Sequence, residues 1–279
     1  ISKIIKQLWK SQVKNKSIDI LKNQKEIAES FKYASYIQNA LLPSPSVIKK
    51  YIPEYFLLFL PRDIVSGDFY YLTQYKKLLY IAVADCTGHG VPGAFMSILG
   101  LTFLNEIIHN EKVESAAGIL NIMREKVMHA LKQTGDDDEQ KDGIDIAMGI
   151  INKETNSINF AGAFNPIYII KQNHLLEIQG DKMPVGIAAS EEKPFTDHNL
   201  LLEEGDMVYF FTDGYVDQFG GPEGKKFKYQ PFRSLLLSIS SLPIHKQKEK
   251  LETTFINWKG NLQQLDDVLI FALRYHPAH

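Results

Sequence analysis

The chain has 279 residues, of which 44% are hydrophobic, 23% charged and 11% aromatic, a composition typical of a folded globular protein with a sizeable core. Its 31 basic and 33 acidic side chains give a formal net charge of −2, which argues against nucleic-acid binding because that requires a basic surplus. One cysteine excludes an intramolecular disulfide framework and a four-cysteine zinc site, and no apolar run reaches the roughly 18 residues of a membrane span.

The first 42 residues contain no Gly or Pro and predict one long helix that ends at Pro43 and Pro45. Apolar residues recur every seven positions along it, which is typical of one seam of a coiled coil. These residues are Val13, Ile20, Ile27, Ala34 and Leu41. The opposite seam is polar, so two interpretations stay open. The helix either packs on its own domain or forms a parallel dimer that carries a signal from an upstream region.

After residue 53, short apolar runs alternate with turns. In chain order they predict strands at 55–60, 67–72 and 78–84, helices at 91–109 and 113–132, an acidic loop at 134–143, strands at 144–151, 157–161, 167–170, 175–178, 200–202 and 207–211, helices at 229–240 and 244–258, and a last strand at 268–275. Runs of strands with helices in pairs indicate an α+β fold whose antiparallel sheets are covered by helices.

Aspartates stand beside small residues at predicted strand edges in four places. The motifs are Ser66-Gly67-Asp68, Asp85-Cys86-Thr87-Gly88, Thr212-Asp213-Gly214 and Asp266-Asp267. Alternate strand ends of an antiparallel sheet share a rim, so these carboxylates can converge there, where they would repel one another unless cations neutralised them. Such hard oxygen ligands suit Mg²⁺ or Mn²⁺, and two such ions support hydrolysis of a phosphoryl group. One Asp-Gly alone would indicate an ordinary turn.

Three further side chains are candidates near these motifs. His89, between two glycines and close to Asp85, is expected either to hold the turn by a local hydrogen bond or to handle a proton near metal-bound water. Arg62 is expected to contact a phosphate or to form a surface salt bridge. Lys225, in the glycine-rich basic segment 219–226, is a candidate contact for a phosphorylated protein. The GxGxxG pattern at 88–93 is not followed by a second parallel strand, which argues against a dinucleotide site.

The ordered motifs resemble those of the SpoIIE/RsbU-like branch of the PPM metal-dependent serine/threonine protein phosphatases, from about residue 36 to 275. The resemblance rests on the segments 37–43, 65–70, 84–94, 142–147, 160–163, 184–186, 212–214 and 266–268. It implies an αββα sandwich, in which two mainly antiparallel sheets are flanked by helix pairs and the metal site lies at one edge.

The resemblance also implies roles for individual residues. Asp85 would bridge two Mn²⁺ or Mg²⁺ ions and, with Asp68, form the catalytic pair. Asp68 and the backbone carbonyl of Cys86 would complete the protein ligands of one ion, and Asp213 and Asp266 those of the other. Three residues remain candidates for a metal or for its immediate surroundings: Asp267 as the alternative to Asp266, Asp142 for a third ion, and His89.

In this family such domains are outputs of bacterial signalling proteins that act on phosphorylated regulators such as anti-sigma-factor antagonists. We therefore expect a dimerising helical linker at 1–42, a phosphatase domain at 43–279, a homodimer through the helix, and no contact with nucleic acid or membrane. A start on Ile rather than Met indicates a fragment whose sensor lies upstream, either cytoplasmic or the cytoplasmic part of a membrane-bound sensor. The alternatives are an inactive docking module and a small-molecule phosphomonoesterase.

Overall fold

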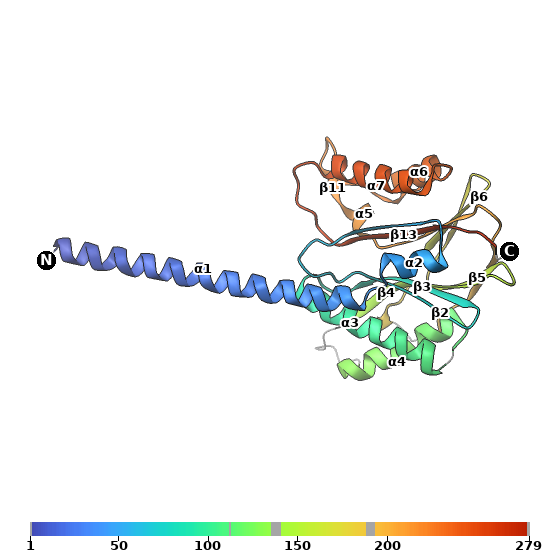
Figure 1. Ribbon diagram of the computed structural model, residues 1–279, viewed down its shortest axis with the longest axis horizontal. Coiled ribbons are helices and arrows are strands. Elements are labelled where there is room, and N and C mark those ends of the chain that lie inside the picture. Colours follow the sequence, from blue (N-terminus) through green and yellow to red (C-terminus); the bar gives the residue numbers. More distant parts are fainter. Residues whose placement is uncertain (1, 112, 135–140, 188–192, 278–279) are drawn as a thin grey trace. The chain divides into compact units, whose positions relative to one another are not determined.

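The computed structural model describes residues 2–111, 113–134, 141–187 and 193–277 (Figure 1). The chain divides into two compact units, Ile1–Ala40 and Leu41–His279. The first unit contains all but the last residue of α1 (Ser2–Leu41), a single helix of 40 residues, as the absence of Gly and Pro predicts. The coiled-coil pairing of this helix stays a prediction.

A short helix that the sequence did not predict opens the second unit. α2 (Pro45–Tyr51) has proline in its first turn, and the Ser44 side chain accepts a hydrogen bond from Val47 N at 3.4 Å. Proline is tolerated in a first turn because the N–H it lacks has no intrahelical partner there. Pro45 therefore begins a helix as well as following the end of α1.

Two antiparallel sheets form the centre of the second unit (Figure 1). The first has the order β1 (Tyr55–Leu60), β13 (Val268–Arg274), β10 (Met207–Phe211), β6 (Ile167–Lys171) and β7 (His174–Ile178). The second has the order β2 (Phe69–Tyr75), β3 (Leu78–Cys86), β4 (Gly143–Asn152), β5 (Ser157–Ala163) and β9 (His198–Leu201), with β8 (Val185–Gly186) beside β4. Every pair of neighbouring strands within each sheet is antiparallel.

Helix pairs cover the outer faces of both sheets (Figure 1). The elements are α3 (Val91–Glu106), the π-helix η1 (Ile107–Glu111) and α4 (Ala116–Leu131) on the second sheet, and α6 (Tyr229–Ile239) and α7 (Ile244–Lys259) on the first. Buried apolar clusters fill both helix–sheet interfaces and the space between the sheets. The predicted αββα sandwich is confirmed.

Contrary to the expectation that no apolar run is long enough for a membrane span, the stretch Val91–Glu111 is long and apolar enough by length and composition, with a mean hydropathy of 1.5. Half of it is buried, and Leu104, Ile107 and Ile108 lie in the cluster between α3, α4 and the second sheet. A helix that is buried in the core of a globular fold is also apolar, because its side chains contact other apolar side chains. We therefore interpret this stretch as a core helix.

Candidate metal centre

The four predicted aspartates gather at one edge of the sandwich. Asp85 lies near the end of β3 and Asp213 follows the end of β10, whereas Asp68 precedes β2 and Asp266 lies just before β13. Antiparallel neighbours bring the end of one strand beside the start of the next, so these positions share an edge. Each of the four carboxylates interacts electrostatically with at least one of the others.

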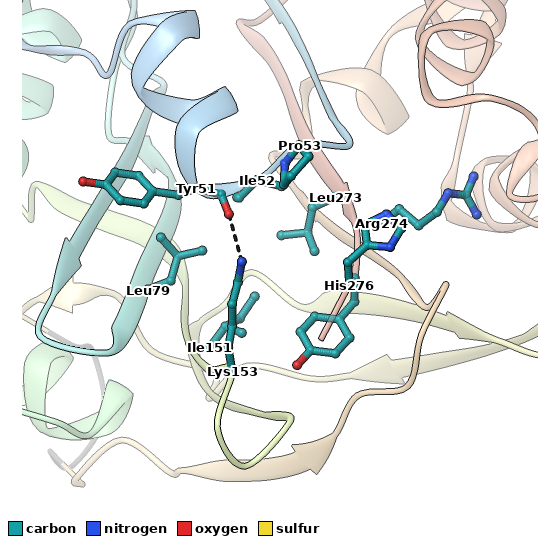
Figure 2. Close-up of a pocket in the computed structure, with 10 residues that line it drawn as sticks. Tyr51, Ile52, Pro53, Leu79, Ile151, Lys153, Leu273, Arg274 and His276 are labelled. Atoms are coloured by element: carbon teal, nitrogen blue, oxygen red, sulfur yellow. Dashed lines mark hydrogen bonds between the residues drawn. The ribbon is translucent and has the colours of Figure 1, made fainter. Parts of the chain in front are cut away.

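A cleft with a volume of about 320 Å³ opens at this edge. Its lining residues are Asp85, Cys86, Thr87, Gly88, His89, Asp145 and Asp266. A second cavity, shown in Figure 2, lies where the same strands begin or end at the opposite edge, and its volume of about 20 Å³ has room for about one water molecule. There Lys153 Nζ donates to the Tyr51 carbonyl at 3.1 Å. The first cleft is the candidate site because carboxylates of the predicted motifs line it.

Asp68 is almost fully buried, with 2% of its surface exposed, and Asp85 is partly buried. Burial, followed by the charge of Asp85, raises the pKa of Asp68 well above its ordinary value. Thr212 Oγ1 donates to Asp68 Oδ2 at 2.6 Å, which acts in the opposite direction. Burial, and then the charges of Asp213 and Asp266, raise the pKa of Asp85 in the same way. A cation between these groups would stabilise their ionised forms.

The other two predicted aspartates, Asp213 and Asp266, are also partly buried. Burial and the charge of Asp217 raise the pKa of Asp213 to about 6, and burial is also the main cause of the raised pKa of Asp266. Asp266 Oδ1 accepts a hydrogen bond from Asp267 N at 2.9 Å, which opposes that rise.

The structure adds one carboxylate that the site prediction did not include. Asp145 pairs with Asp85 across β4 and β3 and lines the cleft, where burial and the charge of Asp213 raise its pKa to about 7. Asp142, the residue predicted near a third ion, is not among the lining residues, and its carbonyl accepts from Gln133 Nε2 at 2.7 Å. The segment 142–147 is one of the motifs on which the family resemblance rests. The sequence does not show which of its two aspartates faces the cleft, whereas the strand register does.

Asp267 turns away from the cleft into the protein. Its Oδ1 accepts from Arg62 N at 2.7 Å, and its Oδ2 accepts from Gly67 N at 2.7 Å. The residue is buried, with 3% of its surface exposed. Asp267 therefore fixes the loop before β2, and it is Asp266 that faces the cleft.

Of the three other candidates, His89 lines the cleft and Arg62 lies within reach of Asp266, whereas Lys225 is not among the lining residues. The Nδ1 of His89 is 3.4 Å from Asp63 Oδ2. Arg62 Nη1 donates to the Leu265 carbonyl at 2.9 Å, and its charge lowers the pKa of Asp266. The Lys225 ammonium pairs with Glu223 at 2.5 Å, and both side chains are exposed.

The donors present fit hard divalent cations. They are carboxylate oxygens with raised pKa values, and burial also raises the pKa of the Cys86 thiol, which leaves the backbone oxygen as the donor of that residue. A Cβ on Gly67 would lie 3.3 Å from the Cys86 carbonyl oxygen, so glycine keeps the loop close to that oxygen. Within the described ranges, no three His, Cys, Asp or Glu side chains form a ready cluster, so an ion here would also need backbone oxygens or water.

The chain is similar to several known proteins. The model of the family described as Stage II sporulation protein E (SpoIIE) matches residues 76–276. The phosphoserine phosphatase RsbU of Bacillus subtilis is 23% identical over 204 residues, which cover 70% of this chain and 55% of RsbU. The chain therefore spans about half the length of that relative.

Two solved structures show the same fold. The SiaA-PP2C domain of Pseudomonas aeruginosa superposes with a TM-score of 0.82 at 29% identity, covering 91% of this chain and 98% of that domain. RsbX in complex with magnesium has a TM-score of 0.53 at 16% identity, covering 79% of this chain and 94% of RsbX.

Proposed function

The chain belongs to the SpoIIE family, and from that premise we propose that it hydrolyses phosphoserine or phosphothreonine on a regulatory protein in bacterial signalling. The observation that carries the proposal is the mutual electrostatic contact of Asp68, Asp85, Asp213 and Asp266 at one edge of the sandwich, where Asp85 and Asp266 line a cleft. The likeness to a PP2C domain at a TM-score of 0.82, and to a phosphoserine phosphatase, supports the same reaction.

The aspartates would hold the divalent ions of this reaction, which supply an activated water and stabilise charge on the phosphoryl group. Asp68, Asp85 and the Cys86 carbonyl would hold one Mn²⁺ or Mg²⁺ ion, and Asp85, Asp213 and Asp266 would hold a second. RsbX, a neighbour in fold, has been crystallised with magnesium, which supports a divalent ion in this chain. Any third ion would meet Asp145 in the cleft rather than Asp142.

The protein's own groups orient these ligands. Thr212 Oγ1 donates to Asp68 and accepts from Leu269 N at 3.1 Å, so one hydroxyl ties Asp68 to β13. Asp267 holds the loop before β2 through Arg62 N and Gly67 N. His89 stands at the mouth of the cleft beside Asp63, where it can exchange a proton with a leaving alcohol.

We further propose that the phosphatase acts in the cytoplasm and dimerises through α1, whose seven-residue apolar repeat can form a parallel seam. Deletion of residues 1–30 should convert a dimer to a monomer in sedimentation velocity and change the rate. An unchanged oligomeric state would contradict dimerisation through α1, and an unchanged rate would contradict control of the activity by this helix.

Phosphate release tests the proposed reaction. Wild type and Asp85→Asn are compared on a phosphoserine protein and on a small phosphate ester, with and without Mn²⁺. We expect Mn²⁺-dependent release from the protein by wild type, reduced at least a hundredfold in the variant. If neither protein released phosphate from either substrate, the chain would be a docking module. Release from the small ester alone would indicate a small-molecule phosphomonoesterase.

A further inference from the structure

A short hairpin borders the metal centre on the side of Asp213. α5 (Gly214–Asp217) begins directly after Asp213, and Asp217 N donates to the Asp213 carbonyl at 2.9 Å. The hairpin strands β11 (Phe219–Gly220) and β12 (Lys225–Lys226) follow as an antiparallel pair. Only the single turn of α5 and Gln218 therefore separate the hairpin from Asp213, a candidate metal ligand.

Contacts that do not involve its lysines anchor this hairpin. Gly221 N donates to the Trp258 carbonyl at 2.8 Å, and a Cβ on Gly220 would lie 1.9 Å from the same oxygen. Phe227, directly after β12, packs edge-to-face with Tyr215 and with Trp258, each at a ring-centroid distance of 5.2 Å. Aromatic pairs and backbone hydrogen bonds of this kind hold a loop without help from exposed charges.

The two lysines of β12 have different partners. Lys225 pairs with Glu223 at the tip of the hairpin, whereas the Lys226 ammonium lies 2.6 Å from the Asp217 carboxylate. The positive charge of Lys226 also lowers the pKa of Asp213, which places that charge within the field of the metal centre. The Lys226 and Asp217 side chains are 44% and 41% exposed, so their ion pair contributes little stability and can exchange partners in water.

A substrate meets an unfavourable charge at this cleft. Its lining includes the carboxylates of Asp85, Asp145 and Asp266, and both a phosphoryl group and an acidic peptide carry negative charge. Positive charge at the rim offsets such repulsion and raises the affinity for an anionic partner. A lysine on a well-anchored hairpin is suited to this, because its flexible ammonium can move from one anion to another.

We propose that Lys226 determines substrate specificity by leaving Asp217 to bind an anionic group of the phosphoprotein, either the phosphate itself or a carboxylate beside the phosphoserine. This inference rests on the proposed phosphatase function. Asp217 is the competing anion that holds the lysine when no substrate is bound.

Steady-state kinetics with Mn²⁺ tests the proposal on three substrates: a phosphoserine peptide flanked by glutamates, the same peptide flanked by glutamines, and phenyl phosphate. Lys226→Gln should raise KM about three- to tenfold with kcat within about twofold, as expected for one partly exposed charge contact, and Lys226→Arg should retain most of the affinity. A rise for the acidic peptide alone identifies a flanking carboxylate as the ligand. A rise for all three substrates identifies the phosphate.

A matched control comes from α7. Lys246 forms a similar exposed pair with Glu249 at 2.7 Å. Lys246 lies near the start of α7, four residues after Leu242. The Leu242 carbonyl accepts from Arg274 Nη2 at 2.9 Å, and Arg274 is at the end of β13 that is remote from the cleft. Lys246→Gln removes the same charge and should leave KM unchanged.

Asp217→Asn separates a contact with substrate from simple neutralisation of Asp217. The variant should lower KM, because it frees the lysine and removes a negative charge, and Lys226→Gln should still raise KM in that background. An effect of Lys226→Gln that disappears when Asp217 is already neutral would overturn the proposal. So would a larger effect of Lys225→Gln, or an active wild type whose KM values do not respond to Lys226→Gln. An inactive wild type would instead remove the phosphatase function on which the inference rests.

Discussion

Asp145 of β4 lies directly opposite Asp85 of β3 in the antiparallel register of the second sheet. Side chains at paired positions share a face and lie within about 5.5 Å at Cβ, so the two carboxylates feel each other's charge. The charge of Asp145 is one of the causes that raise the pKa of Asp85. Without a cation, the folded protein therefore holds protons at this edge that the unfolded chain would release at neutral pH.

The first prediction is that the metal-free protein loses stability as pH rises. Asp145 has a pKa of about 7 in the folded state against 3.8 for the free side chain, so between these values the folded state binds more protons than the unfolded state. A raised pKa gives stability that is complete below about pH 4 and is lost as pH rises through about 7, by roughly 4 kcal/mol for a shift of this size. Asp145→Asn removes this loss.

Chemical denaturation in EDTA at pH 5, 6, 7 and 8 measures the effect. The free energy of unfolding of Asp145→Asn should exceed that of wild type by an amount that grows with pH. Asp19→Asn, at an exposed position of α1, is the control and should show a flat difference. If the difference in the free energy of unfolding between Asp145→Asn and wild type were also independent of pH, the folded state would not raise the pKa of Asp145, and the prediction would be wrong.

A second prediction concerns Mn²⁺ binding. An ion that binds only the folded state stabilises it by about 2.7 kcal/mol at a hundred times its dissociation constant. Mn²⁺ should therefore raise the melting temperature of wild type, and the rise should be largest near pH 8, where cleft carboxylates are ionised. Asp85→Asn should fold but gain little from Mn²⁺. A full Mn²⁺-dependent rise in this variant would mean that the ions bind elsewhere.

A third prediction concerns the Thr212 hydroxyl. Thr212→Val keeps the shape of the side chain but removes the donor to Asp68 and the acceptor for Leu269 N. Both partners are buried, so we expect a loss of about 1–3 kcal/mol in the free energy of unfolding and weaker Mn²⁺ binding by roughly 10- to 100-fold. Calorimetric titration and urea unfolding measure the two effects.

The control for this variant is Thr102→Val on the exposed side of α3. Thr102 Oγ1 donates only to the carbonyl of Ile98, one turn earlier in the same helix, at 2.8 Å. Its replacement should change stability by no more than about 0.5 kcal/mol and leave Mn²⁺ affinity intact. Equal effects of the two substitutions would contradict a special role for Thr212.

The sequence was sufficient to predict the edge of the sandwich, because Asp85 and Asp213 follow strongly apolar runs and Asp266 precedes one. Such runs predict strands, and strand ends in antiparallel sheets meet. The sequence could not distinguish Asp142 from Asp145, since both lie at the start of one strand and only its register against β3 places one of them opposite Asp85.

The hairpin β11–β12 escaped prediction for a different reason. Each of its strands has two residues, which is too short for an alternating pattern, and its position depends on contacts with the distant Trp258. The glycine-rich segment identified a loop but not the direction of its lysines. Sequence therefore placed Lys225 and Lys226 in one basic segment, and the structure separates them by partner.

The last prediction separates Asp266 from Asp267, which sequence left as alternatives. Asp267 accepts backbone hydrogen bonds with both oxygens, so Asp267→Asn turns an amide N–H toward a buried donor and should cost about 3 kcal/mol of stability. Asp266→Asn removes a repelled, half-buried carboxylate from the cleft, so it should leave the metal-free protein as stable as wild type or slightly more stable. It should nevertheless lose most of the Mn²⁺-dependent rise in melting temperature.

Thermal unfolding of both variants with and without Mn²⁺ distinguishes the two roles. For Asp267→Asn we expect a lower melting temperature in EDTA that Mn²⁺ still raises, because the side chain holds the loop before β2 and does not line the cleft. For Asp266→Asn we expect the reverse pattern. If Asp267→Asn were instead stable in EDTA and unresponsive to Mn²⁺, the ligand would be Asp267, and its carboxylate would have to exchange the N–H groups of Arg62 and Gly67 for an ion.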